Sequence, residues 1–315
     1  MIKGTGMVLH KGIEGKMYKL RLKVPYNFDL ELIDRVKELK DKHPDIEYFF
    51  YLPCDPKDCY TTKRKPGLIV PSDDEYLRHI SYLNKKDFDF EVLFQQPGLI
   101  LSDEVLKKYI DLDAKRFTFY EDQNAIRIKE LVPSAYTAAS ITKVFRPEEI
   151  KNRNLSMYDE ICLFFWYNRN LDVIEQLPKK FEYSIIPNTG CKVNCSMHLI
   201  HWFNSKLLFD SISKSCIYTD ESLSSCVSLE DYINWFSKYI SILKLVDRSS
   251  PSDEIIDSLV YYSEGSLDLI KKCSFLEKLL RGHSRDYYNI KSSFPFSITE
   301  ARFKELLEIA QKDNI

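Results

Sequence analysis

The sequence has 315 residues, of which 44% are hydrophobic and 29% are charged, and its 45 basic side chains nearly balance 47 acidic ones. This composition indicates a globular protein with a large core, and the balance argues against a chain whose main task is to coat nucleic acid or an anionic membrane. No run reaches the roughly 18 apolar residues that span a bilayer, and the charged N-terminus lacks the apolar core of a secretory signal. We therefore expect a cytoplasmic protein without a membrane partner or a strong nucleic-acid signal.

Eight short apolar runs, rich in aromatic and β-branched residues, recur along the chain, and amphipathic segments separate most of them. Strands that alternate with helices favour a parallel sheet closed into a (β/α)8 barrel of the TIM type, because closure removes the two exposed edges. The expected strands are Tyr18–Val24, Ile46–Leu52, Phe88–Phe94, Arg116–Tyr120, Ala135–Ile141, Glu160–Trp166, Tyr183–Ile186 and Ile242–Val246.

The remainder of the chain predicts helices. A doubly wound nucleotide-binding fold would need a glycine-rich turn after the first strand, but Pro25–Asp29 (PYNFD) stands there, and no P-loop motif occurs. We divide the chain into a barrel over residues 1–262 and a short helical extension, residues 263–315, that packs on the barrel.

The segment Pro187–Phe203 (PNTGCKVNCSMHLIHWF) follows the seventh expected strand. In a TIM barrel this end of the strands carries the active site. Cys191 and Cys195 are four residues apart, and His198 and His201 follow them. Because helical residues three or four apart share a face, two thiolates and an imidazole can converge on one metal centre.

Cys216 and Cys226 follow in the long segment before the eighth strand and can complete a set of four ligands. The alternative is that these cysteines are small buried residues, since cysteine is among the most buried residue types. In a reducing compartment, we expect the eight cysteines to be buried, reactive or metal-bound rather than paired.

The stretch PNTGCKVNC, with His201 behind it, resembles the N-x-G-C-x-x-x-C segment and later histidine of barrel proteins related to the collagenase-like peptidases of unassigned catalytic type. Cys226–Tyr232 (CVSLEDY) resembles that family's I-R-P-E-D-L-x-x-Y helix, and Leu243–Arg248 (LKLVDR) resembles its F-K-(I/L)-V-G-R final strand. The arginine and proline of the first motif are missing, and Asp247 replaces the glycine of the second. We therefore expect the substrate site to have diverged.

The resemblance implies a (β/α)8 barrel and, in relatives that hydroxylate ubiquinone precursors or modify RNA, an iron–sulfur cluster held by four cysteines. Carried over by position, Cys191 and Cys195 match the paired cysteines, His201 matches the histidine, and Cys216 is the expected third thiolate. Cys226 is the candidate for the fourth, although the family has an aliphatic residue there. A 4Fe-4S cluster is the expected cofactor, and zinc held by Cys191, Cys195 and His201 is the alternative.

Four further residues are candidates for catalysis. Glu121 follows the fourth strand and can act as a general acid or base, or equally cap the next helix. Asn168 belongs to a Trp-Tyr-Asn-Arg-Asn run that suits substrate binding, or core packing. Lys244 and Arg248 complete the set. Lys244 is expected to need a carboxylate or an anionic ligand if it points inward, as are Arg21 and Lys23.

Cys54 and Cys59 lie at the end of the second strand and precede the basic loop Lys63–Lys65. That loop can hold an anionic substrate, or it is simply solvated.

Three functions compete. The first is a metalloenzyme with a thiolate-bound iron–sulfur centre at the barrel mouth, acting on a small-molecule, peptide or RNA-derived substrate; hydroxylation is implied by the resemblance only. The second is a peptidase-like hydrolase or a zinc-binding protein, although the sequence shows no nucleophile–base pair. The third is a non-catalytic accessory protein that binds a partner subunit through the barrel mouth.

Overall fold

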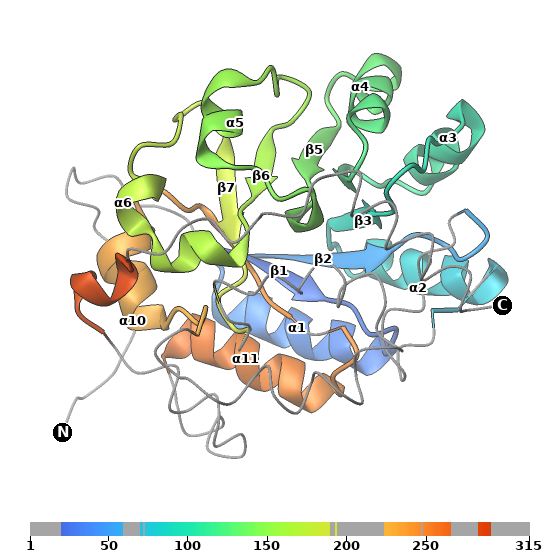
Figure 1. The fold of residues 1–315 in the computed structure, drawn as a ribbon. Coiled ribbons are helices and arrows are strands. Elements are labelled where there is room, and N and C mark those ends of the chain that lie inside the picture. Colours follow the sequence, from blue (N-terminus) through green and yellow to red (C-terminus); the bar gives the residue numbers. More distant parts are fainter. Residues whose placement is uncertain are drawn as a thin grey trace, which may run out of the picture.

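The computed structural model describes residues 20–58, 70–71, 73–189, 193, 224–246, 248–265 and 283–290. Eight parallel strands form a closed barrel, each paired with its neighbours in chain order (Figure 1). The strands are β1 (Arg21–Pro25), β2 (Glu47–Pro53), β3 (Phe90–Phe94), β4 (Arg116–Phe119), β5 (Tyr136–Ala139), β6 (Glu160–Cys162), β7 (Glu182–Ile185) and β8 (Ile242–Lys244). The expected number of strands and the (β/α)8 fold are confirmed, and each strand overlaps its expected range.

Helices connect the strands on the outside of the barrel. The α-helices are α1 (Leu30–Lys42), α2 (Asp73–Lys85), α3 (Asp103–Asp111), α4 (Asp122–Leu131), α5 (Pro147–Asn152), α6 (Leu171–Ile174), α10 (Leu229–Asp231) and α11 (Ser252–Glu264). Short 3-10 turns are η1 (Ile141–Lys143), η2 (Phe165–Arg169) and η6 (Arg285–Tyr288), and η4 (Tyr232–Phe236) is a π-helical turn.

The sixth strand is shorter than the sequence predicts. It ends at Cys162, and the aromatic residues behind it turn into η2, in which Tyr167 N–H donates to the carbonyl of Phe164 at 2.9 Å. The expectation of a strand up to Trp166 is therefore wrong. An apolar run buried on every side lacks the alternation that separates a strand from a helix, so its pattern could not reveal this boundary.

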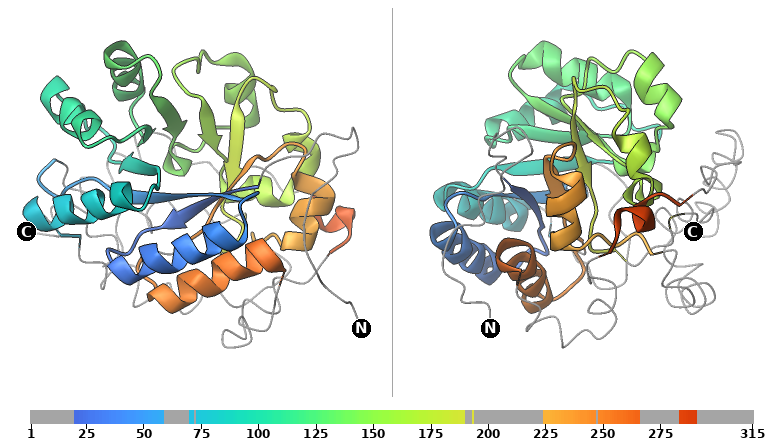
Figure 2. Two further views of the ribbon diagram at one scale, coloured as in Figure 1. Left: turned by 180° about the vertical axis from the view of Figure 1, so that it is seen from behind. Right: turned by 90° about the vertical axis from the view of Figure 1, so that its left-hand side faces the viewer.

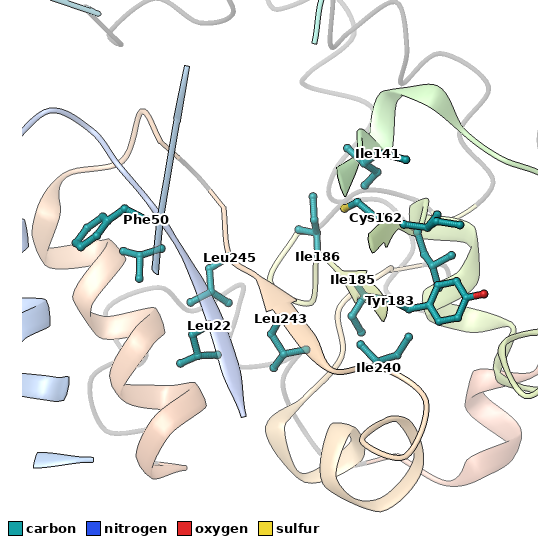
Figure 3. Close-up of a cluster of buried hydrophobic side chains, with 14 of the residues drawn as sticks. Leu22, Phe50, Ile141, Cys162, Tyr183, Ile185, Ile186, Ile240, Leu243 and Leu245 are labelled. Atoms are coloured by element: carbon teal, nitrogen blue, oxygen red, sulfur yellow. The ribbon is translucent and has the colours of Figure 1, made fainter. Parts of the chain in front are cut away.

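Helices α1 and α11 lie side by side, as both further views show (Figure 2), and they pack against β2 and β1 respectively. Asp29 begins α1 by accepting a hydrogen bond from Glu31 N–H at 3.0 Å. The strand residues that face outward, toward the helices, are apolar. Leu22 of β1 gathers with Leu243 and Leu245 where β1 and β8 pair (Figure 3). Because alternate strand residues face opposite sides, the residues between them point into the barrel.

Residues 283–290 contact the barrel through Asn170, which pairs with Asn289, and Arg169, whose carbonyl accepts from Ile290 N–H at 3.1 Å. The other helices expected behind α11 lie outside the described residues, and the division at residue 262 stays a prediction. None of the described helices is long and apolar enough to cross a membrane.

Candidate functional site at the barrel mouth

The barrel interior holds a buried network of opposite charges. Lys23 of β1 forms an ion pair with Glu160 of β6 at 2.8 Å and a second, short one with Glu91 of β3. All three side chains are fully buried. Thr118 donates to Glu91 at 2.6 Å, and Ser184 donates to Glu160 at 2.5 Å. These residues come from five strands, so their contacts run across the inside of the barrel.

The network fixes the charge of its members. Burial alone lowers the pKa of Lys23, but the carboxylates of Glu160 and Glu91 outweigh it and raise the pKa above its ordinary value. Burial alone raises the pKa of Glu91, but Lys23 and Lys244 bring it down to about 2. Lys23 thus remains a cation and Glu91 an anion, as a buried pair with good geometry requires.

Two further ion pairs lie at the amino end of the barrel. Arg21 binds Glu182 at 2.6 Å, and Arg116 binds Glu47 at 3.2 Å. The expectation that inward-facing Arg21 and Lys23 need carboxylate partners is confirmed. Both cations are paired with carboxylates of the barrel, so neither is available to bind a ligand.

Lys244 is the exception among these cations. It is 3% exposed, and its Nζ has no hydrogen-bond partner among the described residues. The nearest carboxylate oxygen that pairs with it, Glu91 Oε1, lies 3.8 Å away, and the Tyr51 ring centroid lies 4.6 Å away. Burial lowers the pKa of the Lys244 amine, and the attraction of Glu91 offsets this only in part.

Arg248 stands four residues beyond Lys244, and its guanidinium lies 5.7 Å from the centroid of the same Tyr51 ring. Within the described ranges, Arg248 makes no hydrogen bond or ion pair. Burial lowers the pKa of this guanidinium. The hydroxyl of Tyr51 donates to the carbonyl of Leu245 at 2.5 Å, which holds the ring against the end of β8. Two basic side chains without hydrogen-bonded partners among the described residues therefore share one aromatic residue at the carboxyl end of the barrel.

Asn188, from the predicted cysteine motif, joins the ends of β7 and β8. Its Oδ1 accepts from Val246 N–H at 2.9 Å, and its Nδ2 donates to the carbonyl of Val246. Both backbone groups of one residue are thus bound by one side-chain amide. This clamp places the start of the cysteine segment beside the stretch that runs from Lys244 to Arg248.

Cys226 is buried and carries a thiol rather than a disulfide. Its Sγ donates to the carbonyl of Thr189 at 3.0 Å, and Ser225 Oγ donates to the same carbonyl at 3.0 Å. Asn168 holds this stretch from the other side, because its Nδ2 donates to the carbonyls of Ser225 at 2.7 Å and Ile186 at 2.8 Å. One predicted ligand therefore contacts Thr189, which stands two residues before Cys191 in the sequence.

Asn168 itself is fully buried, and its Oδ1 has no partner among the described residues. The rest of its run is buried as well. Tyr167 donates to the carbonyl of Phe145 at 2.9 Å, and Arg169 donates to the carbonyls of Tyr287 and Ser224 at 2.7 and 3.1 Å. These contacts support packing as the role of the run and make Asn168 a positioning residue for the stretch that contains Cys226.

Glu121, at the end of β4, accepts from Gly98 N–H at 2.6 Å and so ties down the loop between β3 and α3. It stands at the N-cap position of α4 without a capping hydrogen bond from its side chain. Cys54, at the end of β2, is buried and disulfide-bonded, so it differs from the expectation of reduced thiols and is not a thiolate ligand.

The remaining predicted ligands, Cys191, Cys195, Cys216 and His201, lie outside the described residues, as do Cys59 and Lys63–Lys65. The part of the chain that is described contains no group of three or more metal-binding side chains. The ligand set therefore stays a prediction.

Sequence reasoning missed Glu91, Glu160 and Tyr51. A signal for the glutamates was present, because each is a carboxylate within an otherwise apolar strand, where an ionised group needs a partner. The sequence does not show which strands face one another across a closed barrel, so it could not pair them with Lys23.

The architecture is a closed parallel barrel with charged groups inside it. No protein-family model and no curated protein matches the sequence. Among solved structures, the chain is similar to a U32 peptidase, with 10% identity and a TM-score of 0.46 over 78% of this chain and 96% of that one.

The chain is also similar to a glycerophosphodiester phosphodiesterase from Parabacteroides distasonis, with 9% identity and a TM-score of 0.38 over 77% of this chain and 99% of that one. A third similar structure, an uncharacterized B. cereus protein, has 10% identity and a TM-score of 0.39 over 91% of this chain and 71% of that one. At these identities and TM-scores, the likenesses identify neither a family nor an activity.

Proposed function

We propose that this protein is an enzyme that binds a small anionic substrate at the carboxyl mouth of its barrel, beside β8. The observation that carries the proposal is the pair of basic side chains, Lys244 and Arg248, that both lie near the Tyr51 ring. Among the described strand residues, Arg21, Lys23 and Arg116 each have a carboxylate partner at hydrogen-bond distance. Among the described residues, Arg248 has no carboxylate partner and the buried Lys244 amine has no hydrogen-bond acceptor, so an anion that accepts hydrogen bonds from both groups would be stabilising.

A small anion is expected to stabilise the protein, and Arg248 is expected to provide much of its affinity. At a concentration 100 times the dissociation constant, a ligand adds about 2.7 kcal/mol to the free energy of unfolding. Losing a hydrogen bond to a charged group costs about 1.5–3 kcal/mol, so Arg248→Gln should weaken binding roughly 10- to 100-fold. Calorimetric titration with pyruvate and with inorganic phosphate at low ionic strength measures this.

Arg35→Gln is the matched control, because Arg35 lies on the outer helix α1 and binds Asp253 at 2.6 Å. It should bind both anions as the unmodified protein does. Equal affinity in the Arg248 and Arg35 variants would place the anion elsewhere and overturn the proposal.

We further propose that the cysteine segment holds a thiolate-bound metal centre, an iron–sulfur cluster, at the same mouth. Cys191, Cys195, Cys216 and Cys226 would hold it, and a bound cluster would supply one-electron redox chemistry. Support comes from Cys226, whose thiol is buried against Thr189, two residues before Cys191. Asn188, at the start of this segment, is bound to Val246, which stands between Lys244 and Arg248 in the sequence. Oxygen-independent hydroxylation is the reaction that the motif resemblance favours.

Protein purified without oxygen is expected to be brown and to contain iron and acid-labile sulfide. Cys191→Ala and Cys226→Ala should each remove most of the bound iron, because cluster stability depends on the full set of thiolates. Cys162→Ser is the control, since this buried thiol of β6 is not in the ligand set. Colourless protein with about one zinc per chain that is lost in His201→Ala would instead establish the zinc alternative.

A further inference from the structure

The amine of Lys244 differs from the other buried amine of the barrel in its surroundings. Lys23 lies between two glutamates that keep it protonated. Lys244 has one carboxylate at 3.8 Å, beyond hydrogen-bond distance, and the centroid of the Tyr51 ring at 4.6 Å. An ionised amine without a hydrogen-bonded partner in a dry site costs several kcal/mol, whereas an uncharged amine costs much less. The surroundings of Lys244 thus favour a neutral nucleophile.

From this contrast we infer that Lys244 forms an imine with a carbonyl substrate, and that Arg248 binds a carboxylate of the same molecule. A 2-oxo acid is the simplest substrate class with both groups. The inference rests on the proposed anion site and adds the reacting atom to it. A guanidinium binds a carboxylate through two parallel hydrogen bonds, which would fix the orientation of the neighbouring carbonyl group.

The chemistry balances without an oxidant or a further cofactor. The lone pair of Lys244 Nζ adds to the carbonyl carbon, and the two amine protons leave with the carbonyl oxygen as water, so that a C=N bond replaces the C=O bond. Uptake of one proton from solvent gives an iminium cation. Glu91 remains ionised because its pKa is about 2, and it lies where it can neutralise this cation. Water reverses the reaction and restores the amine.

The test is reductive trapping in the complete protein. The protein is incubated at neutral pH with pyruvate and sodium cyanoborohydride, digested, and mapped by mass spectrometry. An imine reduced by hydride leaves a secondary amine, which adds the mass of the probe less one oxygen. We expect Lys244 to be labelled more than tenfold faster than Lys42 and Lys57, which are exposed lysines in ordinary ion pairs.

Three comparisons make the result specific. Lactate, which has the carboxylate but no ketone, should slow labelling of Lys244 without adding mass. Arg248→Gln should slow labelling by pyruvate but leave labelling by acetaldehyde, which has no carboxylate, unchanged. Lys244→Arg should bind pyruvate in a titration and gain no label at this position.

Labelling of Lys42 and Lys57 without labelling of Lys244 would overturn the imine. If pyruvate still bound in an Arg248-dependent manner, the anion site would survive and only the reaction at Lys244 would fail. Loss of both trapping and Arg248-dependent binding would refute the proposed function itself. Because the trapping is done on the unmodified protein, a variant that fails to fold does not affect this decision.

Discussion

Replacing Lys23 with methionine is expected to lower the free energy of unfolding by about 3–5 kcal/mol, because it breaks a buried ion pair by removing one partner. The substitution nearly preserves side-chain volume, so the cost is electrostatic rather than a cavity. It leaves Glu91 and Glu160 fully buried with no cation between them. Lys244, at 3.8 Å from Glu91, is too distant to replace the lost hydrogen bonds.

Urea unfolding followed by circular dichroism measures the change. Lys37→Met is the control, since Lys37 pairs with Asp41 on the exposed face of α1, and a surface pair of this kind contributes about 0.3–0.5 kcal/mol. Adding Glu91→Gln and Glu160→Gln to Lys23→Met should recover part of the loss, because the uncompensated charges are then removed. A loss below about 1 kcal/mol in Lys23→Met would show that water or a rearranged Lys244 compensates the glutamates.

The fold was predictable because its signal is local and repeated. Strands such as Phe90–Phe94 are mostly apolar and rich in aromatic residues, and the intervening segments, such as Leu30–Lys42, have helical spacing and a capping residue. Closure into a barrel followed from the number of strands. The end of β6 was not predictable, since Leu163–Trp166 is buried on every side, and only the tertiary structure decides between strand and turn.

The candidate site was predictable only in part. That inward lysines need partners followed from electrostatics, and Lys244 and Arg248 were recognised as candidates. Their shared ring, Tyr51, lies on β2, far away in sequence, and no local pattern connects it to β8. The missing hydrogen bond of Lys244 also depends on a small difference in distance that the sequence does not show. The Glu91 oxygen lies 3.8 Å from the amine, whereas a hydrogen bond would need about 2.8 Å.

The motif residues also have structural roles that their spacing does not show. Asn188 precedes the paired cysteines in the sequence, yet its amide is used to bind both backbone groups of Val246. Asp231, in the stretch that resembles the family's R-P-E-D, accepts hydrogen bonds from residues 283–290. A motif that resembles a family signature can thus support the geometry of the mouth without touching a substrate.

The carboxylate of Asp231 is expected to control the attachment of residues 283–290 to the barrel. It is 1% exposed and accepts from Ser228 Oγ and Tyr288 OH at 2.6 Å each and from His283 N–H at 2.8 Å. Burial alone raises the pKa of Asp231, but the hydrogen bonds from His283, Ser228 and Tyr288 outweigh it and lower the pKa. Asp231→Ala leaves these buried donors without their acceptor, which should cost about 2–4 kcal/mol.

Hydrogen exchange distinguishes a local effect from a global one. In Asp231→Ala, amides of residues 283–290 should lose protection before those of the strands, because local opening needs less free energy than global unfolding. Asp172→Ala is the matched control, since Asp172 binds Arg285 of the same segment at 3.0 Å but is 61% exposed. That variant should lose less than about 1 kcal/mol. Equal losses of protection in the two variants would mean that the buried carboxylate is no more important than a surface ion pair, and that Arg169, which donates to the carbonyl of Tyr287 at 2.7 Å, holds the segment instead.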